Sequence, residues 1–237
     1  MEKVIAFLNT EKMVKNSFYL TYVFLLTTAT ITFIEAMRTT DKKVRHILNL
    51  ETCISVVAAY FYSVFMKKIK DNNIDYKEIN TVRYTDWAIT TPIMLLVLCL
   101  AFLYNLSPNK GGNPAKYIKS GFSFFTFLTI LALNFIMLGF GYVGEVGMIS
   151  RPMAMLGGFF GFFSLYAFIY KKFLAGKKNK DNKMLYWAFF IFWIGYGMAY
   201  MTESRTRNAV YNVLDLFSKC FVGIFFWAYF TKTFILK

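Results

Sequence analysis

Two groups of charged residues lie inside apolar stretches, where an ionised side chain is costly unless it has a partner. In YNVLDLFSKCFVGIFF, Asp215 and Lys219 are four residues apart and share one face of a predicted helix. This spacing permits a structural ion pair that fixes helix packing. It equally permits an amine kept in an apolar setting for Schiff-base chemistry, with carboxylates that stabilise its charged form.

The second group lies in RYTDWAITTPIMLLV, where Arg83 precedes Asp86 by three residues and Thr90 follows it by four. These spacings predict that all three side chains share one stripe of a helix. Charged side chains within membrane helices are functional candidates because their burial must be compensated. The two groups together therefore predict a buried, charge-balanced site.

The elements that carry these residues are predicted from composition and hydropathy. Of the 237 residues, 57% are hydrophobic and only 17% are charged, which is too apolar for an ordinary soluble domain. Stretches of roughly 20 apolar residues are long enough to cross a bilayer. We expect an all-α membrane protein, a single domain over 1–237, with seven transmembrane helices at about 17–37, 47–66, 82–104, 118–142, 148–170, 184–202 and 209–233.

The net charge of +14 is spread over short tracts between these stretches, so it does not predict a nucleic-acid surface. Lys and Arg number 15 on one side of the predicted bundle and 10 on the other, which predicts an outer N-terminus and a cytoplasmic C-terminus. We expect the first 16 residues to form a retained surface segment. The three cysteines lack paired spacing and predict neither a disulfide nor a metal site.

The sequence resembles the microbial (type 1) rhodopsins over all seven predicted helices. The matching motifs are Asp215-x-x-x-Lys219, Trp193-x-x-Tyr196 followed by Tyr200, NFIMLGFGYVG, and Arg83-Tyr84-x-Asp86-Trp87-x-x-Thr90-Thr91-Pro92. The first and fifth helices match only by position and hydropathy. The motifs together are specific enough to predict a light-activated pigment with a covalently bound chromophore.

The resemblance implies all-trans retinal, bound as a protonated Schiff base on Lys219. It implies a counterion made of Asp86 and Asp215, with Asp86 as first proton acceptor and Thr90 orienting it. An apolar residue at Met94 resembles green-absorbing members. Any one of the matching aromatic or methionine residues could equally serve core packing. Because they match together, the resemblance predicts a retinal pocket. Its residues are Trp87, Thr91, Met94, Asn134, Met137, Gly141, Trp193, Tyr196 and Tyr200.

The sequence departs from the family pattern at functionally important positions. The usual proline of the sixth helix is Gly197, and the usual cytoplasmic proton donor is Val97. Glu51 either snorkels to the interface or points inward, where it would replace that donor or line a cation path. On the outer side, Glu145 and Glu203 could join a proton-release cluster below Arg83; the family's release position on the seventh helix corresponds to Arg207.

Three functions fit these residues, and we place a weak or slow outward proton pump first. A light-gated cation channel is favoured by Val97, Glu51 and the polar pair Thr91 and Asn134. A photosensor acting through a membrane partner is the third, and an enzyme with a buried lysine in another fold is the alternative outside this class. The expected setting is the cell membrane, as a homo-oligomer and not an enzyme, with lipid, retinal and a proton or other cation as partners.

Overall fold

The computed structural model describes residues 11–70, 74–106 and 123–231, and these residues contain helices and no strand. They form seven rods, which confirms the predicted fold class. The rods are α2 (Glu11–Arg38), α3 (Lys42–Ile69), α4 (Tyr76–Leu106), α6 (Phe124–Glu145), α7 (Arg151–Ile169) with its π-helical end η1 (Tyr170–Leu174), α8 (Lys180–Ala199), and a last rod of α9 (Ser204–Asp215), π-helical η2 (Leu216–Phe221) and α10 (Val222–Thr231).

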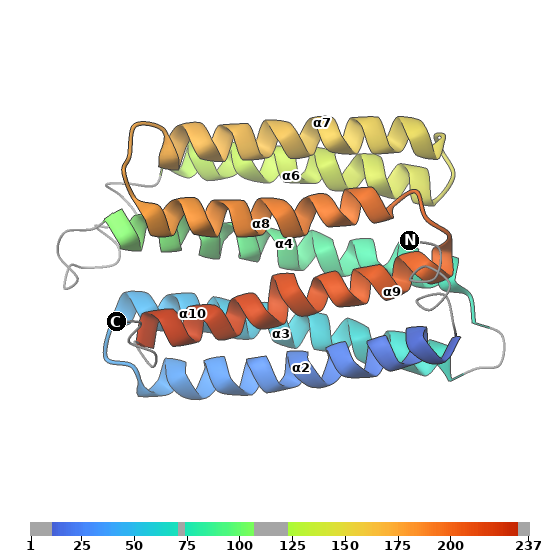
Figure 1. Cartoon of the computed structure of the whole chain (residues 1–237), viewed down its shortest axis with the longest axis horizontal. Coiled ribbons are helices and arrows are strands. Elements are labelled where there is room, and N and C mark those ends of the chain that lie inside the picture. The colour runs from blue at the N-terminus through green and yellow to red at the C-terminus, as the bar shows by residue number, and fades with distance from the viewer. Residues whose placement is uncertain (1–10, 71–73, 107–122, 232–237) are drawn as a thin grey trace.

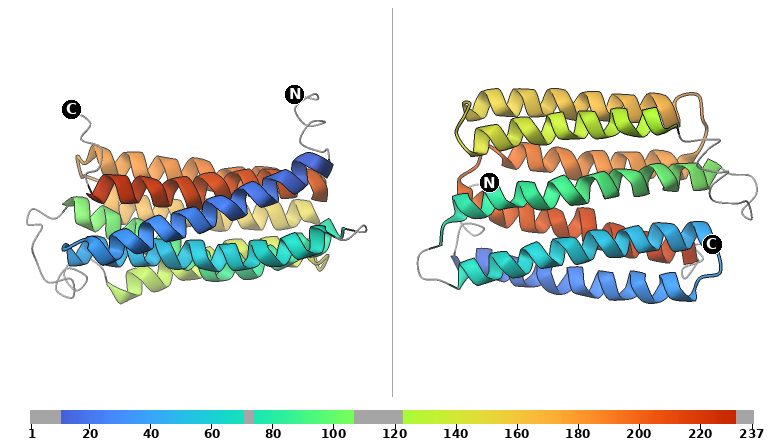
Figure 2. Two further views of the ribbon diagram at one scale, coloured as in Figure 1. Left: turned by 90° about the horizontal axis from the view of Figure 1, so that it is seen from below. Right: turned by 180° about the vertical axis from the view of Figure 1, so that it is seen from behind.

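The rods lie side by side and alternate in direction, so that α2 begins at one end of the bundle and α10 ends at the other (Figure 1). Helices α2 and α3 lie along one edge and α6 and α7 along the opposite edge, with α4, α8 and the last rod between them (Figure 2). The two charged segments found in the sequence, on α4 and on the last rod, therefore lie in the middle of the bundle.

Among the described residues, six rods are long and apolar enough to cross a membrane. The seventh, α8, opens with the polar run Lys180–Lys183, and this shortens its apolar part. The helices extend beyond several predicted limits: α2 begins at Glu11 instead of 17, and α9 begins at Ser204 instead of 209. Backbone groups at the membrane surface still gain from internal hydrogen bonds, so helices continue into polar sequence that hydropathy assigns to loops.

Other predicted limits moved inward or lie outside the described residues. Helix α8 ends at Ala199 instead of 202, where the chain turns toward α9. The described part of α6 starts at Phe124 after the cap residue Ser123. The predicted helical residues 118–122 and the first ten residues of the predicted surface segment lie outside the described part of the chain.

Local sequence signals set several helix ends. The Asp41 carboxylate accepts hydrogen bonds from the backbone N–H groups of Lys43 and Val44 at the start of α3. The Asn179 side chain caps α8 in the same way. These side chains satisfy donors that the first helical turn leaves free. The turn between α6 and α7 contains Gly147 at φ +82°, a conformation that favours glycine.

Helices α6 and α7 approach closely at Gly161. A Cβ atom added there would lie 2.8 Å from the Met137 backbone nitrogen and 2.9 Å from its Cα. Backbone atoms cannot yield as the end of a flexible side chain can. The absent side chain of Gly161 therefore sets the separation of these two helices, and with it one wall of the bundle interior.

We predict that Gly161→Ala destabilises the protein by about 1–3 kcal/mol, the usual cost of overpacking. Thermal unfolding in detergent would measure the loss. Gly139→Ala is the matched control, because a Cβ there meets nothing within 4 Å and alanine favours the helix. Equal melting temperatures for the two variants would contradict the proposed close packing.

Candidate functional site

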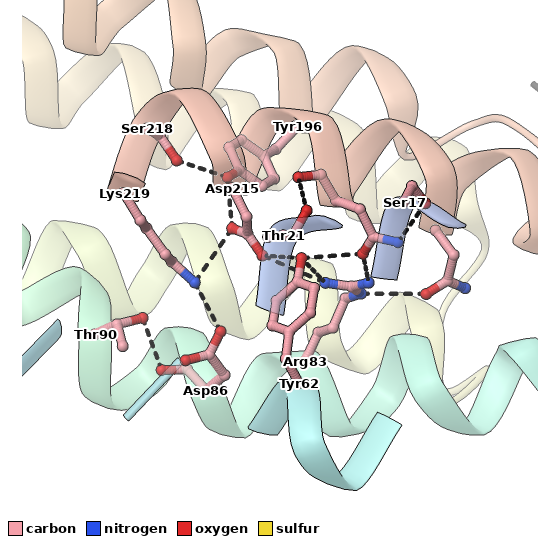
Figure 3. Close-up of polar contacts among 12 residues, drawn as sticks. Ser17, Thr21, Tyr62, Arg83, Asp86, Thr90, Tyr196, Asp215, Ser218 and Lys219 are labelled. Atoms are coloured by element: carbon pink, nitrogen blue, oxygen red, sulfur yellow. Dashed lines mark hydrogen bonds and ion pairs between the residues drawn. The ribbon is translucent and has the colours of Figure 1, made fainter. Parts of the chain in front are cut away.

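The Lys219 side chain lies between two carboxylates inside the bundle (Figure 3). Its Nζ atom is 2.7 Å from Asp86 Oδ2 on α4 and 3.2 Å from Asp215 Oδ1, one turn earlier on its own rod. Both carboxylates are fully buried. An ammonium group and two carboxylates in this arrangement compensate one another's burial, because each charge replaces part of the water that the others have lost.

Asp215 is held by more groups than Asp86. Hydroxyls of Tyr196 and Tyr62 donate to its two oxygens at 2.7 and 2.8 Å, and Arg83 Nη1 lies 3.4 Å away. By contrast, Asp86 Oδ1 has no hydrogen-bond partner among the described residues. The two carboxylates are therefore unequal: Asp215 is stabilised as an anion from several directions, whereas Asp86 keeps an oxygen free to take a proton.

Arg83 lies beyond Asp215, toward the start of α4. Its guanidinium donates to the side-chain oxygens of Asn208 at 3.2 Å and of Asn212, and to the Tyr62 hydroxyl at 3.2 Å. Its Cζ atom also lies 4.9 Å from the centre of the Phe65 ring. Amide, hydroxyl and aromatic groups thus hold the buried Arg83 cation in place, and it is not paired with one carboxylate alone. Its positive charge therefore acts on the whole group of charged residues around Lys219.

The predicted stripe of Arg83, Asp86 and Thr90 is buried along α4. One detail differs from expectation: the Thr90 hydroxyl donates to the backbone carbonyl of Asp86 at 2.9 Å and not to its carboxylate. A threonine within a helix readily bonds the carbonyl four residues earlier. The Asp86 carboxylate is therefore oriented by Lys219.

The rod that carries Lys219 is π-helical from Leu216 to Phe221. Such short π-helical segments often occur at functional sites because they change the direction of side chains within a helix. The Thr28 hydroxyl lies 3.5 Å from the Cys220 carbonyl in this segment. The sequence motifs do not predict this change in helix type.

A largely apolar cavity extends from Lys219 toward α7. Eight of the nine predicted pocket residues line it: Trp87, Thr91, Met94, Met137, Gly141, Trp193, Tyr196 and Tyr200. The ninth, Asn134, lies behind the wall, where its side-chain nitrogen donates to Thr91 Oγ1 at 2.9 Å. The cavity thus combines a buried amine at one end with aromatic and methionine walls.

The sequence motifs do not predict several residues of the site. Tyr62, Ser218, Asn208 and Asn212 complete the polar network, and Tyr211, four residues before Asp215, lines the cavity. The four-residue spacing could have indicated Tyr211. The far wall comes from α7 and is formed by five apolar residues that no sequence motif marks: Ala154, Met155, Gly158, Phe159 and Phe162.

Gly197 also lines the cavity, within a continuous α8. A Cβ there would lie 2.8 Å from the Phe159 ring, so the glycine makes room for an aromatic wall residue. Its visible role here is close packing between α7 and α8.

Glu51 points into the bundle instead of snorkelling to the interface. Only 2% of the residue is exposed, and its carboxyl has no hydrogen-bond or ion-pair partner among the described residues. A Cβ added at Gly223, one turn after Lys219 in the chain, would lie 3.1 Å from Glu51 Oε2. Val97, at the position of the absent donor, is buried in the apolar core.

Glu145 does not join Arg83. It forms a buried ion pair with Arg207 instead, and Arg151 Nη2 lies 3.7 Å from its other oxygen. Glu203 is exposed at the start of α9. Arg83 contacts Asn208 on that side, so the structure does not assemble the carboxylate release cluster considered from the sequence.

Comparisons with known proteins agree with this architecture. The chain is 52% identical to viral rhodopsin OLPVRII, whose crystal structure matches with a TM-score of 0.84 over 93% of this chain and 99% of that one. It is 23% identical to a green-light absorbing proteorhodopsin of Gamma-proteobacterium EBAC31A08, over 89% of this chain and 84% of the relative.

The proton pumping rhodopsin AR2 from Acetabularia acetabulum shares the fold, with a TM-score of 0.70 at 14% identity over 93% of this chain and 96% of that one. The family model described as bacteriorhodopsin-like protein matches residues 13–233. Since that match spans nearly the whole bundle, including both charged segments, the chain belongs to the bacteriorhodopsin-like family of microbial (type 1) rhodopsins.

Proposed function

We propose that this protein binds all-trans retinal on Lys219 and moves protons outward across the membrane in response to light. The residues fit such a group: a buried amine opens into a cavity whose walls are almost entirely apolar. An aldehyde with a long apolar tail satisfies both features. When bound, retinal would supply light absorption and a light-driven change of shape.

The inequality of the two carboxylates is the observation that supports proton transfer. Asp86 makes the shorter contact with Lys219 and has an oxygen without a partner among the described residues. Asp215 is held by two hydroxyls and lies close to Arg83. A proton that leaves the Lys219 nitrogen would therefore go to Asp86, while Asp215 remains the anion that balances Arg83.

The proposed outward direction of proton transport follows from the positions of the polar groups. Arg83 and its amide partners lie on the side of Asp86 that we expect to face outward, whereas the other side holds Val97 and Glu51. Buried apolar packing around Val97 hinders return of a proton from the cytoplasm. Glu51 is the candidate donor, and its isolation in the core predicts slow reprotonation.

We predict that Asp86→Asn abolishes light-driven transport and shifts absorption to longer wavelength, because the cationic end of the chromophore loses a nearby negative charge. In the unmodified protein, acidification should cause the same shift as Asp86 takes up a proton. The Asp86→Asn variant should lack that pH response. Spectral titration would measure both effects, and a pH-dependent shift that persists in this variant would assign the titration to another group.

Transport mode is tested by light-induced current under voltage clamp in cells supplied with retinal. A pump should give outward current at zero voltage without reversal. Lys219→Ala should give neither colour nor current, because it removes the attachment amine. Current that reverses with the cation gradient would instead identify a channel, and a coloured protein without current would favour a sensor.

The channel alternative has its own structural support in the buried Glu51, which has no partner in the described part of the chain, and in the bonded pair Thr91 and Asn134. If Glu51 is the proton donor, Glu51→Gln should slow recovery of the dark state by about a hundredfold or more, the range for loss of a general acid. Flash photolysis would measure this rate. Glu78→Gln is the control, because Glu78 pairs with Lys68 at the bundle surface. Unchanged recovery in Glu51→Gln would remove it as the donor.

The remaining expectations follow from the same assignment. Met94, which lines the cavity, supports green absorption. We propose that residues 1–237 form one membrane domain with an outer N-terminus and that the protein assembles as a homo-oligomer in the cell membrane.

A further inference from the structure

We propose that Asn80 binds an internal water molecule, and that protons released from the site pass outward beyond Arg83 through this water instead of through Glu145. The inference rests on the proposed proton transport for its second part. Its first part, a hydration site between α4 and α9, stands independently of transport.

Asn80 is almost completely buried, yet neither its side-chain nitrogen nor its side-chain oxygen has a hydrogen-bond partner among the described residues. A carboxamide offers two donors and an acceptor, and burying them unpaired is strongly unfavourable in a membrane protein. Buried polar groups that lack protein partners are commonly satisfied by internal water. A bound water molecule would therefore supply the hydrogen bonds that the Asn80 carboxamide lacks.

Asn208 on α9 contacts α4 on both sides of Asn80 along the helix. The Asn208 side chain accepts from Arg83 Nε at 3.2 Å and donates to the Tyr76 carbonyl at 3.1 Å. Tyr76 and Arg83 lie four residues before and three after Asn80, on the same stripe of α4. Asn80 thus lies between the two points that Asn208 contacts.

The Asn208 side chain also connects this region to the end of the bundle. Asn208 also donates to the Ser204 carbonyl at 2.9 Å, in the first turn of α9. Tyr76, in the first turn of α4, has a buried hydroxyl without a hydrogen-bond partner in the described chain, and the Arg205 guanidinium lies over its ring. Polar groups therefore continue from Arg83 to the helix ends, and the described residues that form these bonds include no carboxylate.

Glu145 is the alternative group through which protons could leave, but its ion pairs make it a poor proton acceptor. Its carboxylate pairs with the fully buried Arg207 and lies near Arg151. Accepting a proton would leave Arg207 without its counter-charge inside the protein, which is costly. A water molecule held by neutral amides can pass a proton on without breaking a buried ion pair, and it leaves no charge behind when the proton moves on.

The test compares Asn80→Leu with the double variant Glu145→Gln, Arg207→Gln, in which both charges are removed together. Dark absorption checks folding and pigment formation in each variant. A pH-sensitive dye then times the appearance of protons after a flash, in detergent, where net transport is not required. Infrared difference spectra in water and in H₂¹⁸O identify bands of internal water.

We expect Asn80→Leu to lose a water band and to delay proton appearance by about tenfold or more, as when a barrier rises by roughly one hydrogen bond. The double variant should keep both the band and the timing. If leucine prevents folding, Asn80→Asp provides the second test: a carboxyl in the passage should make proton appearance slower and dependent on pH.

Unchanged water bands and timing in both Asn80 variants would overturn the proposal. A delay in the double variant but not in Asn80→Leu would assign the exit to Glu145. Loss of the water band without any delay would retain the hydration site and refute the route. If Asn80→Leu behaves as expected but the unmodified protein shows no net current, the site stands and the pump assignment fails.

Discussion

The ammonium group of Lys219 lies where surrounding helices replace water, so nearby side chains must balance its charge. Asp86 and Asp215 do so directly, at 2.7 and 3.2 Å. Arg83 then requires the amides and aromatic rings around it, because two buried cations and two buried anions must be held close together. Much of the surrounding polar structure follows from this requirement.

Hydrogen bonding makes the two carboxylates different although both are fully buried. Tyr62 comes from α3 and Tyr196 from α8, and both donate to Asp215. Asp86 receives no such bond from Thr90, whose hydroxyl is used by the backbone. Chemical asymmetry between identical groups thus arises from helices that are remote in sequence, and it supports a division into a fixed anion and a proton acceptor.

Close packing at glycines gives the apolar cavity its walls. Gly161 lets α7 approach the backbone of α6, and Gly197 makes room for Phe159 beside α8. Aromatic and methionine side chains can then surround the cavity that begins at Lys219. The rigid walls and the charged end have different physical origins, since one depends on shape and the other on charge balance.

Hydropathy alone predicted the seven helices, because a bilayer demands long apolar segments whose backbone groups bond internally. Four-residue spacing placed Asp215 with Lys219 on one face, and the motif on α4 indicated their partner Asp86. Spacing within a helix could not decide which face of α3 would bury Glu51, nor that Thr90 would bond a carbonyl. Those outcomes depend on neighbouring helices.

The tertiary structure alone decided the α7 wall of the cavity, the pairing of Glu145 with Arg207, and the bonds of Asn208 to Arg83 and Tyr76. An apolar helix carries no local mark of which residues face a cavity. A polar residue likewise carries no mark of its partner on a distant helix. The sequence determined the membrane helices and the principal charged residues, whereas packing between helices decided which groups meet, because those contacts join residues with no regular spacing along the chain.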